Sequence, residues 1–214
     1  EPMNCTASVR EDSCEVWVPT QAQDKVRDQV AEMTGLLPEQ VTVHTTYLGG
    51  GFGRRLEVDF VVQAVLISKA VGKPVKVIWS REEDIQHDFY RPAMVAKLMT
   101  GLNVNHTPVV FAARLVGPSI LTRTMPTWLT KNLDYVAAQG ISELPYQIQH
   151  QYIDYVMTDT PVPVGFWRSL GHSYNAFFVE SFIDQIAHAT KKDPFALRRE
   201  LLKQQPDFLQ VLDT

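Results

Sequence analysis

Cysteine is scarce in this chain. The 214 residues include only Cys5 and Cys14, whose spacing is not that of a metal-binding Cys-x-x-Cys pair. The six histidines form no metal-ligand pattern with cysteines or carboxylates. Neither a disulfide framework nor a metal site is therefore expected, and cysteine usage leaves the cellular compartment open.

Long apolar runs and an excess of basic charge are also missing. The longest apolar stretch, residues 60–70, is interrupted by Gln63, Ser68 and Lys69 and is too short for a membrane span. The net charge of −4 gives a nucleic-acid partner no electrostatic support. The chain does not start with methionine and has no signal-type apolar segment, which suggests an internal cut.

The order of strand-like and helix-like segments predicts an α+β fold with mixed β-sheets and packed helices. Thr20, Ser80 and Asp193 are expected helix N-caps, and the helix at residues 56–71 is apolar on almost every side, which predicts full burial. Two lobes, 1–116 and 117–214, are expected. Strands are expected at 15–18, 41–48, 75–79, 93–103, 109–116 and 148–157, and helices at 20–33, 56–71, 176–190 and 194–203.

Four glycines surround Phe52 in the stretch YLGGGFGRRLEVDF, between a predicted strand and a predicted helix. Bare backbone at such a junction is typical of an anion site, because the N–H groups of the first helical turn point at the ligand. Arg54 and Arg55 favour this interpretation, since two cations at a helix N-terminus need a negative neighbour, which Glu57 and Asp59 could supply only in part. The pattern fits neither a dinucleotide fingerprint nor a phosphate loop. A tight turn with surface arginines is the alternative.

Four motifs give the chain a family resemblance. EPMNCTASV, GGGFGRR, WSREEDIQHDFYRP and GFWRSLGHSYNAFFVESFIDQIAHATKKDPFALRRELL occur in this order. The chain resembles the molybdenum-binding large subunit of the xanthine dehydrogenase and aldehyde oxidase family over nearly its whole length. It is most similar to the isoquinoline 1-oxidoreductase beta-subunit type, which includes membrane-associated aldehyde dehydrogenases and nicotinate dehydrogenases.

The resemblance implies that the glycine loop lies against a molybdopterin cofactor, expected in its cytosine dinucleotide form. The backbone N–H of Phe52 would be directed at the oxygen ligands of the metal. Arg168, in FWRSLGHS, matches the cofactor-contacting arginine of the family, so Phe52 and Arg168 are expected to converge on one cleft. The cofactor-binding residues implied in this way are Gly50, Gly51, Phe52, Gly53, Arg54 and Arg168.

Two departures from the purine-oxidising relatives affect the implied substrate pocket. Leu56 stands where those relatives carry glutamate, and Leu170 stands where they carry a stacking phenylalanine. Trp167 could supply an aromatic wall instead. An aldehyde or an N-heteroaromatic ring is therefore expected as substrate in place of a purine.

The reaction implied is hydroxylation at carbon with water as the oxygen source and electrons passed to a 2Fe-2S small subunit. A cytochrome c subunit is a further candidate partner. The glutamate base of the family lies outside this chain, and none of Glu57, Glu143 and Glu180 matches its motif, so no catalytic residue is assigned here. The isolated chain is expected to be an inactive fragment without cofactor.

Two alternatives and the location stay open. The chain could be a non-catalytic binding or interaction domain, or an anion-binding domain that uses the glycine loop. The family suggests a bacterial periplasmic or membrane-associated protein, and a cytoplasmic location also stays open. His172, a lone histidine in a Gly-His-Ser turn, is expected to be structural.

Overall fold

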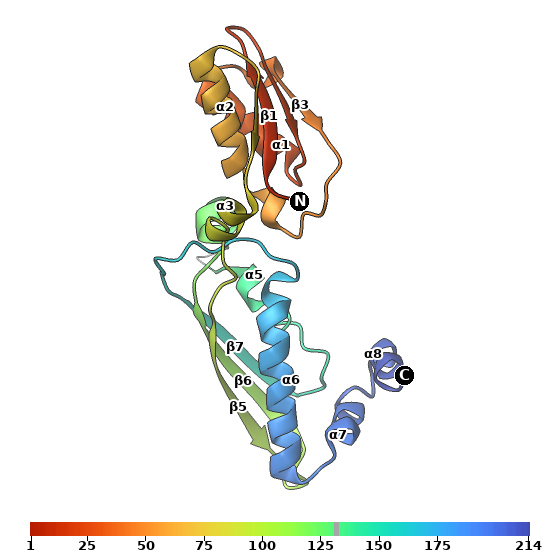
Figure 1. Ribbon diagram of the computed structural model, residues 1–214. Coiled ribbons are helices and arrows are strands. Elements are labelled where there is room, and N and C mark those ends of the chain that lie inside the picture. Colours follow the sequence, from red (N-terminus) through yellow and green to blue (C-terminus); the bar gives the residue numbers. More distant parts are fainter. Residues whose placement is uncertain (131–132) are drawn as a thin grey trace. The chain divides into compact units, whose positions relative to one another are not determined.

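The computed structural model describes residues 1–130 and 133–214 and confirms an α+β fold. Contacts group the chain into two compact units (Figure 1). The first comprises Glu1–Tyr90 with Gly165–Trp167, and the second comprises Arg91–Val164 with Arg168–Thr214. The lobe boundary expected at residues 116 and 117 falls at the end of a strand within the second unit.

A four-stranded sheet forms the first unit, in the order β3-β2-β1-β4. β1 (Asn4–Val9) is antiparallel to both β2 (Cys14–Val18) and β4 (Val75–Ile78). β2 is parallel to β3 (Val41–Thr45). β1 was not among the predicted strands, although its buried residues alternate with half-buried ones for much of its length, as expected of a strand with one covered face.

Helices α1 (Gln23–Thr34) and α2 (Asp59–Val71) pack with the sheet into one hydrophobic core. The prediction that α2 is buried all round is wrong: Leu66 is 51% and Ile67 44% exposed. A helix that lies on one face of a sheet buries a single stripe, so an apolar composition does not imply full burial. The short helices η1 (Pro38–Gln40) and α3 (Arg81–Gln86) complete the unit's helical segments outside the glycine loop.

The predicted helix starts have mixed outcomes in this unit. Ser80 is confirmed as the N-cap of α3, because its hydroxyl accepts a hydrogen bond from the Glu83 N–H at 3.1 Å. Thr20 is not the cap of α1, which starts after Ala22. The Thr20 hydroxyl instead donates to the Arg55 carbonyl at 3.1 Å and accepts from Ala22 N–H at 3.0 Å.

Arg55 is fully buried beneath the glycine loop. Its guanidinium donates to the carbonyls of Gly50 (3.1 Å), Pro19 (2.9 Å) and Glu1 (3.3 Å), and it lies 3.5 Å from the Glu1 carboxylate. Burial lowers the pKa of Arg55, an effect that the Glu1 carboxylate opposes. These partners meet the requirement that a buried charge be paired and hydrogen-bonded.

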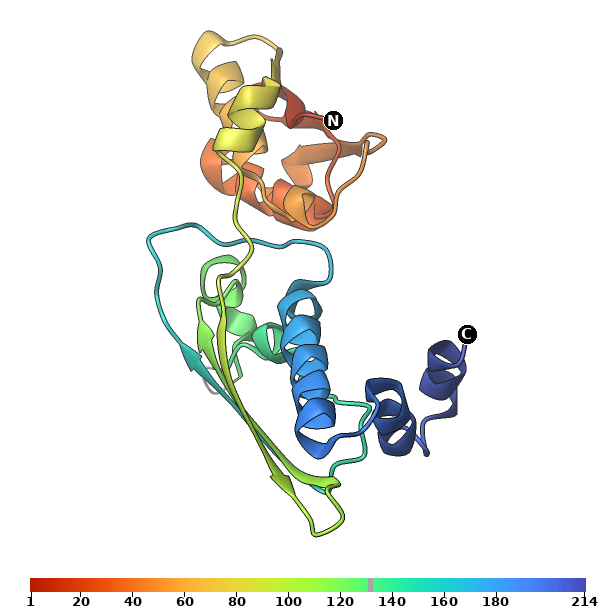
Figure 2. The ribbon, with the colours of Figure 1, turned by 60° about the horizontal axis from the view of Figure 1, so that its bottom comes forward.

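A three-stranded sheet forms the core of the second unit. β5 (Val95–Leu102) and β6 (Pro108–Gly117) are antiparallel, as the predicted hairpin requires, and β6 is parallel to β7 (His150–Met157). The long helix α6 (Leu170–Thr190) lies along the sheet, as the turned view in Figure 2 shows. Buried Phe111, Leu115 and Ile183 belong to the core they share.

Shorter helices complete the second unit: α4 (Leu121–Thr124), η3 (Pro126–Trp128), α5 (Tyr135–Ala138), α7 (Pro194–Leu201) and α8 (Pro206–Leu212). Asp193 is confirmed as the N-cap of α7, since its carboxylate accepts from the Ala196 N–H at 2.9 Å. No helix among the described residues is long and apolar enough to cross a bilayer.

Removing the buried Arg55 side chain should destabilise the protein. Arg55→Met leaves the Gly50, Pro19 and Glu1 carbonyls without their donor, and breaking a buried charge network typically costs about 3–5 kcal/mol. The free energy of unfolding from urea denaturation measures this loss. The partly exposed Arg27 pairs with Asp24 and Asp28 at the surface, so Arg27→Met is the control and should change little. Equal stabilities of the two variants would contradict the structural role of Arg55.

The two cysteines should resist thiol reagents in the native protein. Burial raises the pKa of Cys5 to about 12, with a further contribution from Cys14, and raises that of Cys14 to about 11 with a further contribution from Glu15. The nucleophilic thiolate is therefore scarce at pH 8. We expect no fast reaction with a chromogenic disulfide reagent until denaturant is added, when both thiols should react; rapid native-state labelling would be inconsistent with this burial.

Candidate functional site

The glycine loop occupies the connection between β3 and the 3₁₀ turn η2 (Arg54–Leu56). The sequence had suggested that the glycines open the helix that follows them. They do not do so directly, because α2 begins only at Asp59. The reason is that the two arginines take part in a separate short turn, and two residues separate the end of this turn from α2. The helix N-terminus and the glycines are thus distinct features.

Left-handed backbone conformations shape this loop. φ is +105° at Gly50, +51° at Phe52 and +95° at Gly53. A residue with a side chain rarely adopts such angles, so Phe52 is held in an unusual conformation between two glycines. Strain of this kind occurs preferentially at functional sites, which makes the loop a candidate on its own geometry.

Gly53 also permits a close approach between distant parts of the chain. A Cβ atom at this position would lie 2.6 Å from the carbonyl oxygen of Phe166, the first residue of the motif FWRSLGHS. The Gly53 N–H donates to the side-chain oxygen of Gln21 at 3.0 Å. The first unit therefore brings the glycine loop against the Phe-Trp part of FWRSLGHS, more than 100 positions away in sequence.

Phe52 presents its backbone and its ring at the surface. Its side chain is 60% exposed, and its N–H makes no hydrogen bond with any described residue. A backbone donor without an internal partner is available to a bound ligand or to solvent. This is the arrangement expected if the Phe52 N–H contacts a ligand and the Phe52 ring contributes little to ligand binding.

Arg54, in contrast, is buried and internally paired. Its terminal nitrogens donate to both Asp59 carboxylate oxygens at 2.9 and 2.8 Å, and its Nε lies 2.7 Å from Asp88 Oδ1. Burial alone would lower the pKa of Arg54, but the hydrogen bonds and charge of Asp59, with the charge of Asp88, outweigh it and raise the pKa. The Phe89 ring lies 5.3 Å from the guanidinium. The negative neighbour that the sequence analysis looked for is thus found within the chain.

Arg168 is exposed, and its guanidinium has no partner among the described residues. It lies in the second unit, just before α6, and is followed by Ser169 and Leu170 with φ of +73° and +43°. An exposed guanidinium offers a planar set of five donors to an anion or a heterocycle. Its expected convergence with Phe52 stays a prediction, because the two residues belong to different units.

The three residues expected to line a substrate pocket are placed as follows. Leu56 and Trp167 lie in the first unit, where Leu56 ends the 3₁₀ turn and Trp167 is 39% exposed. Leu170 lies in the second unit, where it is half-buried at the first position of α6. The indole N–H of Trp167 donates to the Phe89 carbonyl at 2.8 Å. That hydrogen bond fixes the ring without using its faces, so one face can still stack on a planar ligand.

Two of the glutamates that the sequence left unassigned have internal partners. Glu143 accepts from the Gly140 N–H at 3.0 Å and lies 3.8 Å from His172 Nε2. Glu180 accepts from the Tyr146 hydroxyl at 2.9 Å. Across residues 1–130 and 133–214 no cluster of three histidine, cysteine or carboxylate side chains has a metal-binding geometry.

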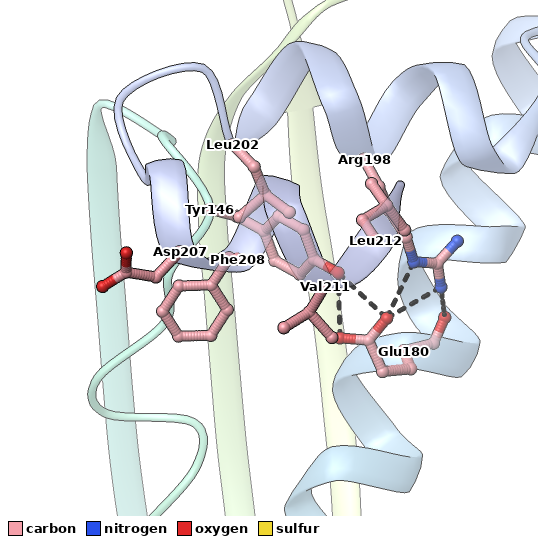
Figure 3. A pocket seen from close by; sticks show the side chains of 8 residues that line it. All are labelled: Tyr146, Glu180, Arg198, Leu202, Asp207, Phe208, Val211 and Leu212. Atoms are coloured by element: carbon pink, nitrogen blue, oxygen red, sulfur yellow. Dashed lines mark hydrogen bonds and ion pairs between the residues drawn. The ribbon is translucent and has the colours of Figure 1, made fainter. Parts of the chain in front are cut away.

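A cavity of about 440 Å³ lies apart from these residues, between α6, α7 and α8 (Figure 3). Its polar wall is a closed network: Glu180 accepts from Tyr146 and from Arg198 Nε at 2.9 Å, and Arg198 also reaches Asp184 at 2.6 Å. Since these donors are already used, the cavity offers mainly apolar contact. It is lined by Tyr146, Glu180, Arg198, Leu202, Asp207, Phe208, Val211 and Leu212.

Several residues around the glycine loop were not predicted from sequence patterns. Gln21, Asp88 and Phe89 contact the glycine loop or its neighbours, yet each lies in an ordinary helical or connecting segment. The signal that could have found Asp88 is the Arg54-Arg55 pair of the glycine loop, which needs acidic partners, because Asp88 pairs with Arg54. No comparable signal marks Gln21.

Comparison with known proteins identifies relatives of the chain. The chain is 31% identical over 217 residues to the isoquinoline 1-oxidoreductase subunit beta of Brevundimonas diminuta, covering 100% of this chain and 28% of the relative. It is 29% identical over 214 residues to a membrane-bound aldehyde dehydrogenase (pyrroloquinoline-quinone) of Gluconacetobacter polyoxogenes, covering 94% of this chain and 27% of the relative. The chain thus spans less than a third of these relatives.

Solved structures share the fold. Quinoline 2-oxidoreductase from Pseudomonas putida 86 superposes with a TM-score of 0.76 at 21% identity, covering 93% of this chain and 26% of the other. An aldehyde oxidoreductase from Desulfovibrio desulfuricans gives a TM-score of 0.78 at 17% identity, covering 94% and 22%.

The family assignment follows from a match over almost the whole chain. The profile of the molybdopterin cofactor-binding domain covers residues 1–202, which include the glycine loop, the Phe-Trp-Arg motif and helix α7. The chain therefore belongs to the molybdopterin cofactor-binding domain family.

Proposed function

We propose that this chain supplies the glycine-loop part of the cofactor site in a molybdenum-dependent oxidoreductase. The observation that carries the proposal is the Phe52 N–H, which no described residue accepts, in a strained loop bordered by Gly50 and Gly53. Such a loop lets a large group approach the backbone, because neither glycine places a Cβ in its way. The family match over residues 1–202 supports a molybdopterin as that group.

The residues present fit the group with a division of roles. The Phe52 N–H would donate to an oxygen of the cofactor, and the exposed guanidinium of Arg168 would donate to a phosphate or a pterin heteroatom. Arg54 was expected to contact the cofactor, but its two terminal nitrogens donate to Asp59 and its guanidinium is ion-paired with Asp88, so we assign it the task of holding the loop. When bound, the molybdopterin group supplies the metal centre at which the substrate is hydroxylated.

The substrate class that suits this chain is an aldehyde or an N-heteroaromatic ring. Leu56 and Leu170 offer apolar surface and no hydrogen bond, whereas a site that selects a purine would use polar groups to discriminate. The Trp167 ring is available to stack. Relatives named as acting on isoquinoline, aldehydes and nicotinate support this choice.

The finer parts of the proposal rest on the family resemblance. Water would be the oxygen source, the cofactor would be the cytosine dinucleotide form, and electrons would leave through a 2Fe-2S small subunit, with a cytochrome c subunit as a further candidate. Several relatives are named as subunits, which supports a multi-subunit enzyme. The glutamate base would come from a part of the enzyme outside residues 1–214.

The enzyme that contains this chain should prefer aldehydes or N-heterocycles to purines. A substrate panel on the intact complex, with an artificial electron acceptor, measures kcat/KM for benzaldehyde, isoquinoline, nicotinate, xanthine and hypoxanthine. A preference for xanthine or hypoxanthine would overturn the substrate assignment. Residues 1–214 alone should show no turnover, because the proposed base and electron acceptor are missing; turnover by this chain without added subunits would refute the incomplete-site hypothesis.

Substitutions in the glycine loop should separate backbone from side-chain roles. Gly53→Ala places a Cβ 2.6 Å from the Phe166 carbonyl at a φ of +95°, so it should cost about 1–3 kcal/mol in strain and lower cofactor content. Gly51→Val meets the flexible end of Gln21 and should be intermediate. Phe52→Ala removes an exposed ring and should be the mildest. Molybdenum content per subunit and the melting temperature measure the order, and a Phe52→Ala loss larger than that of Gly53→Ala would contradict it.

A further inference from the structure

The chain segment Val164–Leu170, which carries Trp167 and Arg168, is held by hydrogen bonds to its backbone. In the first unit, the Gly165 N–H donates to the Tyr90 carbonyl at 3.0 Å. In the second unit, Arg91 Nη2 donates to the Arg168 carbonyl at 3.1 Å, and Arg91 Nη1 reaches the Leu170 carbonyl at 3.5 Å. The Phe89 and Tyr90 carbonyls accept from the Trp167 indole and the Gly165 N–H, and Arg91 is the member of this 89–91 stretch whose side chain donates to the backbone carbonyls of the segment.

The two carbonyls that Arg91 holds enclose the strained part of the segment. Ser169 lies between them, and both Ser169 and Leu170 have positive φ. Two consecutive non-glycine residues in this conformation persist only where their surroundings enforce it. A single planar guanidinium that reaches the carbonyls on both sides of Ser169 is suited to do so, because its donors have a fixed mutual geometry.

The start of α6 adds a second constraint on the same turn. A Cβ at Gly171 would lie 2.2 Å from the Val136 carbonyl of α5, so α6 is seated against α5 without room for adjustment. The buried Asn175 amide donates to the Ala137 and Gln139 carbonyls at 2.9 and 2.8 Å. With the helix fixed from Gly171 onward, Arg91 controls the remaining freedom, the backbone of residues 168–170.

We infer that Arg91 is a positioning residue for Arg168: by holding the Arg168 and Leu170 carbonyls, it fixes the backbone turn that directs the exposed Arg168 guanidinium toward the cofactor. The inference rests on the proposed function, since it takes Arg168 as a cofactor contact. It also places the side chain of Leu170, the expected substrate-pocket residue, under the same control. Arg91 itself is not required to touch cofactor or substrate.

A matched pair of arginine variants tests this role in the full-length subunit within its assembled enzyme. Arg123 also holds a carbonyl of the segment, since its Nη2 and Nε donate to the Val164 oxygen at 2.8 and 3.2 Å, but Val164 precedes Arg168 by four positions. Arg91→Met and Arg123→Met are compared with wild type, and Arg91→Lys is the conservative variant. Lysine keeps the charge but cannot present two fixed donors.

We expect Arg91→Met to retain the molybdopterin cofactor about 10-fold less well than wild type, the low end of the 10–100-fold effects typical of residues that support a ligand-binding group. Arg91→Lys should be intermediate and Arg123→Met close to wild type, with the melting temperatures of Arg91→Met and Arg123→Met lowered to a similar extent. Hydrogen exchange should accelerate in the peptide covering residues 168–172 in Arg91→Met and not in Arg123→Met.

Two results would overturn the inference: equal cofactor retention in Arg91→Met and Arg123→Met, or unchanged exchange at residues 168–172 in Arg91→Met. If Arg91→Met does not accumulate as folded protein, Arg91→Lys supplies the same two measurements. A wild-type enzyme without molybdopterin would instead refute the proposed function, and the exchange measurement would still decide whether Arg91 holds the turn. The two failures are therefore distinguishable.

Discussion

The buried cation of Arg55 is the constraint on which the first unit depends. A guanidinium removed from water must find acceptors nearby, and this one finds them in the glycine loop, at the end of β2 and at residue 1. Its own carbonyl accepts from the Thr20 hydroxyl and from the Gln21 N–H at 3.0 Å. Gln21 then accepts from the Gly53 N–H. The position of the loop is thus determined by a closed set of polar contacts more than by apolar packing.

The two arginines of the glycine loop and Arg168 of FWRSLGHS differ in how their charges are paired. Arg55 is enclosed by carbonyls, and Arg54 is neutralised by Asp59 and Asp88. Arg168 remains exposed with no partner among the described residues. A group that must bind an anionic ligand reversibly cannot already be paired, because the ligand would have to displace an internal carboxylate. This difference, not the presence of arginine as such, distinguishes a supporting residue from a contacting one.

Sequence patterns anticipated the elements whose signals are local. The β5–β6 hairpin alternates as an antiparallel pair should, and Ser80 and Asp193 cap helices through contacts only three residues away. Patterns did not anticipate the six residues by which α6 extends before Ala176, because Gly171, His172 and Ser173 are weak helix formers that tertiary contacts hold in place.

The site was predictable to the extent that it is encoded in contiguous motifs. The strained Phe52 and the exposed Arg168 both lie in such motifs. The sequence pointed to Asp59 as a partial partner of the two arginines, but it could not identify Asp88 as a second partner of Arg54, because the two lie 34 positions apart. Burial and charge pairing arise from the three-dimensional fold, and a motif does not reveal them.

The chain passes between the two units three times, because Gly165–Trp167 returns to the first unit after Arg91–Val164 has formed most of the second. The returning residues are buried or pack closely there: Phe166 lies against Gly53, and Gly165 against Phe89. During synthesis, the ribosome must therefore release residue 167 before the first unit can be completed. The units cannot mature one after the other from the N-terminus, and the glycine loop acquires its final neighbours only once the greater part of the chain has emerged.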